Sequence, residues 1–186
     1  MRGLLTISDG IDRVLEVIAR ATGWLFLVLI GVIFFDVITR KFGFQLPYFG
    51  STRLQELEWH LHAVLFLGWL GYCYVRNVHV RIDVATGSLN PRAQAWLEIL
   101  GLFVFAFPYC LVATYYSYGF FETSFVQNES SDAPNGLAYR WIIKFCLFAA
   151  LVTVLLSCAS VLFRKLVFLF GPAALAQRAG GATVQH

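Results

Sequence analysis

Long runs without a charged residue constrain this chain more than any other feature of its sequence. Residues 59–75, 99–121 and 145–163 contain no Asp, Glu, Lys or Arg, and residues 21–39 contain Asp36 alone. A helix needs about 20 mainly apolar residues to cross the hydrocarbon core of a bilayer. Backbone groups in lipid must be satisfied internally, and runs of this length favour helices over the short strands of a barrel. The sequence therefore predicts an all-α integral membrane protein.

The composition leaves little chain for anything outside the membrane. Charged residues make up 13% of the 186 residues, about half the share of an ordinary soluble domain. We expect a single membrane domain over residues 1–170 and a disordered tail over residues 171–186. Four transmembrane helices are expected, at about residues 21–39, 53–76, 91–121 and 138–165.

The first twenty residues are too polar to span a membrane. Apolar residues recur at helical spacing over residues 4–20, and Asp9, Asp12 and Glu16 lie on the other side. This pattern predicts an amphipathic helix that lies at the membrane interface and leads into the first span. The acidic residues also speak against a cleaved signal peptide.

Local signals place several helix features. Asn90-Pro91 predicts a helix start, with Asn as N-cap and Pro at the first helical position. Pro108 predicts a kink, because proline removes one backbone hydrogen bond. Asp36 and Arg40 are one helical turn apart, which favours an ion pair over an isolated functional carboxylate.

The distribution of positive charge predicts the orientation. With a cytoplasmic N-terminus, nine Lys and Arg residues fall on the cytoplasmic side and five on the outer side. Both termini are therefore expected in the cytoplasm, with the chain in the bacterial inner membrane. The acidic residues expected on the outer side are Asp36, Glu56, Glu58, Glu122, Glu129 and Asp132.

Residues 55–62 suggest chemistry at first sight. Glu56 and His60, like Glu58 and His62, are spaced four apart, but the two pairs point to roughly opposite faces of a helix. They cannot converge on one metal ion, and the four dispersed cysteines have no metal-ligand spacing. We expect no enzyme, no catalytic residue, no metal and no cofactor. The net charge of +3 does not point to nucleic acid.

The chain resembles the small membrane subunit (Q subunit, DctQ-like) of tripartite ATP-independent periplasmic (TRAP) transporters. The His-Val-Arg-Ile-Asp run at residues 79–83 is the most specific element of this resemblance. The other matching residues are Arg40-Lys41-Phe42, Glu56, Glu58, Trp59, Gly68, Gly71, Gly136-Leu137, Trp141 and Lys144.

The resemblance implies a separate small subunit that braces a larger, multi-span transport subunit. That large subunit would carry the substrate and use the sodium gradient. A periplasmic substrate-binding protein would be the other partner, and an organic acid or related solute the cargo. We expect an outer acidic rim to help dock the binding protein or fix the large subunit, and its residues are Glu56, Glu58, Glu122, Glu129 and Asp132. The candidate interface or structural residues are Asp36, Arg40, Glu56, Glu58, Trp59, His79, Arg81 and Asp83.

Two other classes remain open from the residues alone. A membrane anchor subunit of a redox enzyme would also have apolar helices and no catalytic site. A small independent four-helix exporter would depend on a membrane-embedded carboxylate, for which Asp36 is the candidate.

Overall fold

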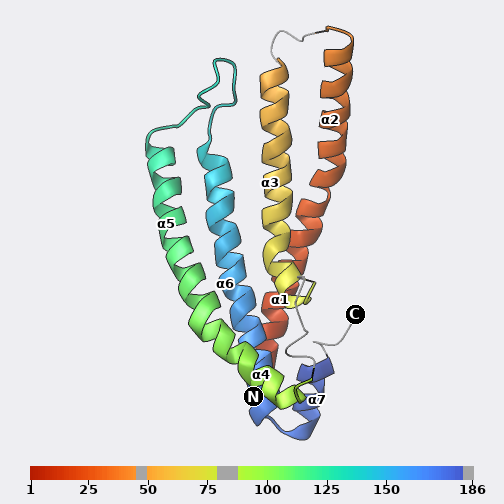
Figure 1. Ribbon diagram of the computed structural model, residues 1–186, viewed down its shortest axis with the longest axis vertical. Coiled ribbons are helices and arrows are strands. Elements are labelled where there is room, and N and C mark those ends of the chain that lie inside the picture. The colour runs from red at the N-terminus through yellow and green to blue at the C-terminus, as the bar shows by residue number, and fades with distance from the viewer. Residues whose placement is uncertain (45–49, 79–87, 182–186) are drawn as a thin grey trace. The chain divides into compact units, whose positions relative to one another are not determined.

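The computed structural model describes residues 1–44, 50–78 and 88–181 (Figure 1). Every regular element in these residues is helical, which confirms the predicted all-α class. In chain order the elements are α1 (Arg2–Gly23), α2 (Leu25–Lys41), α3 (Ser51–Val75), α4 (Pro91–Gly101), the π-helical segment η1 (Leu102–Ala106), α5 (Phe107–Val126), α6 (Trp141–Phe170) and α7 (Ala173–Gly181).

Three helical stretches in the described residues are long and apolar enough to cross a membrane. They are Arg2–Lys41, Pro91–Val126 and Trp141–Phe170. Helix α3 has 25 residues, which is enough length for a span, but its first half carries several polar side chains. The fourth span therefore stays a prediction.

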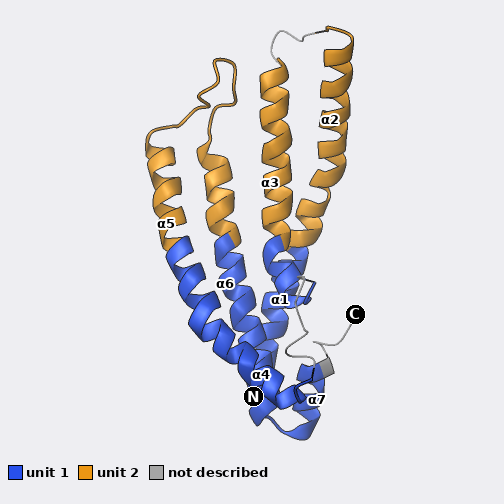
Figure 2. Cartoon of the chain, viewed as in Figure 1, with its two compact units in different colours: residues 1–17, 70–113, 151–186 blue, residues 18–69, 114–150 orange. Residues whose placement is uncertain are grey.

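The chain forms two compact units (Figure 2). Unit 1 comprises residues 1–17, 70–113 and 151–186, and unit 2 comprises residues 18–69 and 114–150. The long helices contribute segments to both units.

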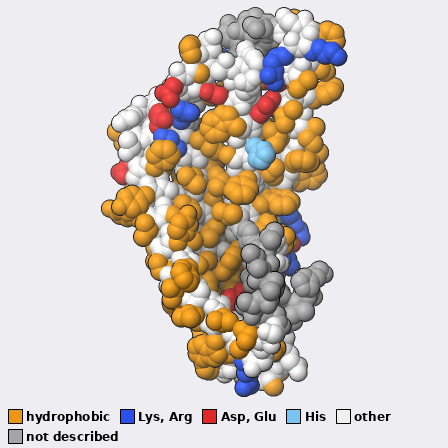
Figure 3. All heavy atoms as spheres, in the orientation of Figure 1, with side chains coloured by type: hydrophobic (Ala, Val, Ile, Leu, Met, Phe, Trp, Pro, Cys, Tyr) orange, Lys and Arg blue, Asp and Glu red, His pale blue; other side chains and the backbone are white. Residues whose placement is uncertain are grey.

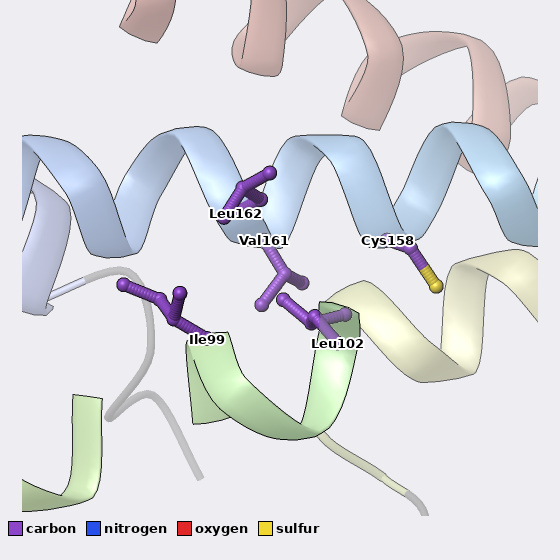
Figure 4. Packing of buried hydrophobic residues seen from close by; sticks show 5 residues of the cluster. All are labelled: Ile99, Leu102, Cys158, Val161 and Leu162. Carbon is purple, nitrogen blue, oxygen red and sulfur yellow. The ribbon is translucent and has the colours of Figure 1, made fainter. Parts of the chain in front are cut away.

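The core of unit 1 forms where α4 and η1 meet α6. Ile99 and Leu102 pack against Cys158, Val161 and Leu162, and all five side chains are buried (Figure 4). A second, smaller cluster joins Leu5, Val167 and Ala179, from α1, α6 and α7. Helix α7 thus lies within the segment expected to be a disordered tail, while residues 182–186 fall outside the described residues.

Unit 2 is packed through aromatic side chains and one close helix contact. Phe121 and Phe125 of α5 lie 5.3 Å from Phe145 and 5.2 Å from Trp141 of α6, respectively, between ring centroids. A Cβ built on Gly68 of α3 would lie 2.4 Å from the Thr22 hydroxyl oxygen at the end of α1. Gly68 therefore allows two helices to approach closely, which is how membrane helices commonly pack.

The sequence signals for helix starts and breaks are confirmed or explained. The Asn90 side chain accepts a hydrogen bond from the Ala93 amide at 2.7 Å, so Asn90 is the N-cap of α4. Near Pro108 the helix takes a π-helical form, in which the Phe107 amide bonds to the Leu102 carbonyl. Pro108 has no amide hydrogen and cannot make the regular helical hydrogen bond, and the wider π-helical turn lies directly before it.

Three helices end in the same way. Gly43, Asn77 and Asn128 follow α2, α3 and α5 with positive φ angles between 46° and 66°. After α2, the Gly43 amide bonds to the Arg40 carbonyl and the Phe44 amide to the Thr39 carbonyl. This pattern is the Schellman motif, and it satisfies carbonyls that a helix end leaves free.

Candidate functional site

Asp36 and Arg40 form the ion pair that their spacing predicts. The Asp36 side chain is fully buried, while the Arg40 side chain is half exposed. Ser51, at the start of α3, donates a hydrogen bond to the other oxygen, Asp36 Oδ1, at 3.5 Å. Asp36 therefore joins the end of α2 to the start of α3 within unit 2.

Glu56 organises the loop that connects α5 to α6. One carboxylate oxygen accepts a hydrogen bond from the Ser131 hydroxyl, and the other accepts the Leu137 amide at 2.5 Å. A Cβ on Gly136 would lie 2.9 Å from Glu56 and closer still to Ser131. A glycine at residue 136 leaves room for this arrangement.

Glu58 points to a different surface of α3. Its oxygen Oε1 is buried and has no hydrogen-bond partner among the described residues. An open groove of about 560 Å³ runs along α2 and α3 beside it. The groove is lined mainly by Leu29, Ile33, Glu58, Trp59, His62 and Phe66. Trp59 is 42% exposed and Phe66 61% exposed, so apolar surface surrounds the carboxylate.

The remaining acidic residues of the predicted outer side differ in their surroundings. Glu129 pairs with Lys144, which also lies over the Phe120 ring at 3.8 Å from its centroid. This Lys144 hydrogen bond holds the pKa of Glu129 below its usual range. Asp132 is fully exposed and lies 3.3 Å from Arg140 Nη1, and Glu122 is exposed on α5.

Charged and apolar surfaces of unit 2 are separated. Lys and Arg side chains lie near the end of α2 and the start of α3, acidic side chains gather mainly toward the loop between α5 and α6, and hydrophobic side chains cover the helices beyond them (Figure 3). The charged groups of the end of α2 and the start of α3 are Asp36, Arg40, Lys41, Arg53, Glu56 and Glu58. Four of the predicted site residues therefore lie in the same part of unit 2, and Trp59 adjoins them.

The three predicted residues His79, Arg81 and Asp83 lie outside the described residues. Of the two histidines on α3, His60 contacts the Glu56 carbonyl through Nδ1 at 2.6 Å, and His62 lines the groove. In the described part of the chain, no three His, Cys, Asp or Glu side chains gather as metal ligands would.

A buried polar network in unit 1 was not predicted from the sequence. Arg164 Nη2 on α6 donates to Asp9 Oδ1 at 2.8 Å and to Asp12 Oδ2 at 2.5 Å on α1. Ser160 donates to Asp12 at 2.6 Å and lies 2.7 Å from the Ser8 hydroxyl. An arginine in an otherwise apolar helix requires such counterions.

This network places part of the polar side of the N-terminal helix against another helix. Ser8, Asp9 and Asp12 contact α6, whereas Ile7, Val14 and Val17 are each more than half exposed. The spacing of Asp9 and Asp12, one turn apart, could have indicated a shared cationic partner. Whether α1 lies at a membrane interface stays a prediction.

One protein-family model matches most of this chain. The model of the DctQ component of tripartite ATP-independent periplasmic transporters matches residues 29–168. The chain belongs to the DctQ family. No match was found among curated proteins or among solved structures.

The DctQ match includes the residues of unit 2 described above. Asp36, Arg40, Glu56, Glu58 and Trp59 all lie within residues 29–168. Arg164 also lies within them, but its partners Asp9 and Asp12 precede the matched region. As a member of the DctQ family with membrane-spanning helices, the chain is an integral membrane component of a transporter.

Proposed function

We propose that this chain is the small scaffold subunit of a sodium-driven TRAP transporter. It braces the large transport subunit and supports uptake of an organic acid, or a related solute, that a periplasmic binding protein delivers. The chain crosses the bacterial inner membrane four times, with α3 as the fourth span, and both termini are cytoplasmic.

The DctQ match over most of the chain carries this proposal. The exposure of α2 agrees with a scaffold role, because Leu29 and Asp36 are its two buried residues. The rest of α2 presents apolar side chains, including Phe26 and Phe34. In a membrane such a surface packs against lipid or against another membrane protein.

The polarity of α3 supports its place beside a protein partner. Gln55, Glu58 and His62 would be costly if they faced the hydrocarbon core. A membrane-spanning helix can carry these residues when its polar side packs against another protein.

Co-purification and transport test the proposal together. A tagged chain, expressed with the large subunit and the binding protein of its transporter, should retain the large subunit in mild detergent. Vesicles containing both membrane subunits should take up solute only with binding protein and an inward sodium gradient. Uptake by the large subunit alone, at the rate of the complete transporter, would refute a bracing role.

The orientation has its own test. Reporter enzymes that are active only in the periplasm should be inactive when fused at either terminus. They should be active when inserted in the loop between α5 and α6. Activity of a fusion at the C-terminus would overturn the four-span topology.

A further inference from the structure

The groove on α2 and α3 is lined by a carboxyl group, that of Glu58, which has no ion-pair partner of its own among the described residues. Asp36 and Arg40 are the charged side chains that act on it most strongly. Glu58 is repelled by Asp36 and attracted by Arg40, but Arg40 makes its ion pair with Asp36. The Glu58 oxygen Oε1 is buried without a hydrogen-bond partner in the described residues. The Glu58 carboxyl group beside the groove therefore lacks a donor of its own.

Lipid is a poor occupant of this groove. A buried carboxylate without a partner is costly, and the cost rises in an apolar environment. Leu29, Ile33 and Phe66 provide an apolar wall, so lipid would leave the carboxylate unsatisfied. The surroundings favour an occupant that brings both apolar surface and a positive charge.

A basic side chain on an apolar helix has both properties. Lys and Arg carry an apolar stem that packs along hydrophobic surface and a charged end that pairs with a carboxylate. Trp59 lies beside Glu58 and is 42% exposed, so its ring is available to a cation as well. A bare metal ion fits less well, because hard cations require several oxygen ligands and the groove supplies few.

The geometry points to a Lys or Arg side chain, from a membrane helix of the large transport subunit, that enters this groove and pairs with Glu58. The inference rests on the proposed function, since it names the surface through which the small subunit holds its partner. The apolar rim at Ile33 and Phe66 packs against the body of the same helix.

A charge-neutral variant tests the role of Glu58. Glu58→Gln keeps the shape of the side chain, and Glu16→Gln makes the same charge change on α1, at a residue that does not line the groove. The groove variant should lower the affinity for the large subunit about tenfold, which corresponds to about 1.4 kcal/mol. The control variant should retain the wild-type affinity. Equal affinities for Glu58→Gln and the wild type would overturn the inference.

A cross-linking experiment keeps the test independent of variant folding. A photoreactive residue in place of Phe66 lies at the groove edge, and one in place of Tyr116 on α5 is a control of similar exposure. With Glu58 intact, the Phe66 probe should capture the large subunit at a peptide with Lys or Arg within one helical turn. Replacing that basic residue with Glu should restore complex formation to Glu58→Lys.

Failure of the inference differs from failure of the proposed function. If the wild-type complex co-purifies but the Phe66 probe captures lipid, a second copy of this chain or a peptide without a basic residue, the groove assignment is wrong. If the wild-type chain does not hold a large subunit at all, both the proposed function and the groove assignment are wrong.

Discussion

Arg164 Nη2 lies 2.5 Å from Asp12 Oδ2, and this contact joins α6 to α1 within unit 1. Asp9 completes the arrangement at 2.8 Å from the same nitrogen. The guanidinium is nearly buried, so the cost of burying it is offset by its pairing with the two carboxylates.

Removing the guanidinium should strongly destabilise unit 1. Arg164→Ala leaves Asp12 without a cationic partner, and breaking a buried pair in this way costs about 3–5 kcal/mol. Titration of the purified protein with a denaturing detergent measures the change. Arg92→Ala, at an exposed position on α4, is the control. Equal midpoints for the two variants would show that the network contributes nothing to stability.

The contact between Gly68 and Thr22 should not tolerate a methyl group. Gly68→Ala places a Cβ 2.4 Å from the Thr22 hydroxyl oxygen, and such overpacking typically costs about 1–3 kcal/mol. At Gly31 on α2 no atom lies within 4 Å of the corresponding Cβ. Gly31→Ala should therefore be neutral or stabilising, because alanine favours helices. Thermal unfolding compares the two, and a lower melting temperature for Gly31→Ala alone would contradict the packing argument.

The loop between α5 and α6 should lose order without the Glu56 carboxylate. Glu56→Ala leaves the Leu137 amide without its acceptor at 2.5 Å, at a cost of about 1–3 kcal/mol. Hydrogen exchange at Leu137 should become faster, while amides in the middle of α6 keep their protection. Unchanged exchange at Leu137 would mean that another group holds the loop.

Acid should weaken the fold partly through Glu129. Its pKa is lowered by the Lys144 hydrogen bond, so the ionised form stabilises the folded state. This contribution is complete above the pKa of the unfolded chain and is lost as the pH falls through the lower folded-state pKa. Glu129→Gln should therefore lose less stability than the wild type between about pH 7 and about pH 3. Parallel losses in melting temperature would refute the assignment, and Glu122→Gln is the control.

Local patterns predicted local structure well. The Asn90 cap and the Asp36–Arg40 pair follow from spacings of three and four residues, which a helix fixes by itself. The helix ends were less well predicted: α6 is Trp141–Phe170 rather than 138–165, and the third expected span extends to Val126. Side chains near a helix end change its length in ways that an apolar run does not encode.

The sequence patterns did not predict contacts between distant segments. Periodicity showed that α1 has a polar face, but not that this face would meet Arg164 rather than water. Glu56 was predicted at an interface, and its bonds to Ser131 and Leu137 depend on a loop more than 70 residues away. Glu58 and Trp59 were predicted as site residues. The groove beside them was not predicted, because it depends on how α2 and α3 are placed in space.

The bond between Arg164 and Asp12 also sets an order of events during synthesis. The two residues are 152 positions apart, so the ribosome needs roughly 8–30 s between them at about 5–20 residues per second. For that time Asp9 and Asp12 are in place without the guanidinium that later pairs with them. A chain stopped before α6 would keep these carboxylates uncompensated. The polar side of the first helix is therefore completed only when the last long helix has been made.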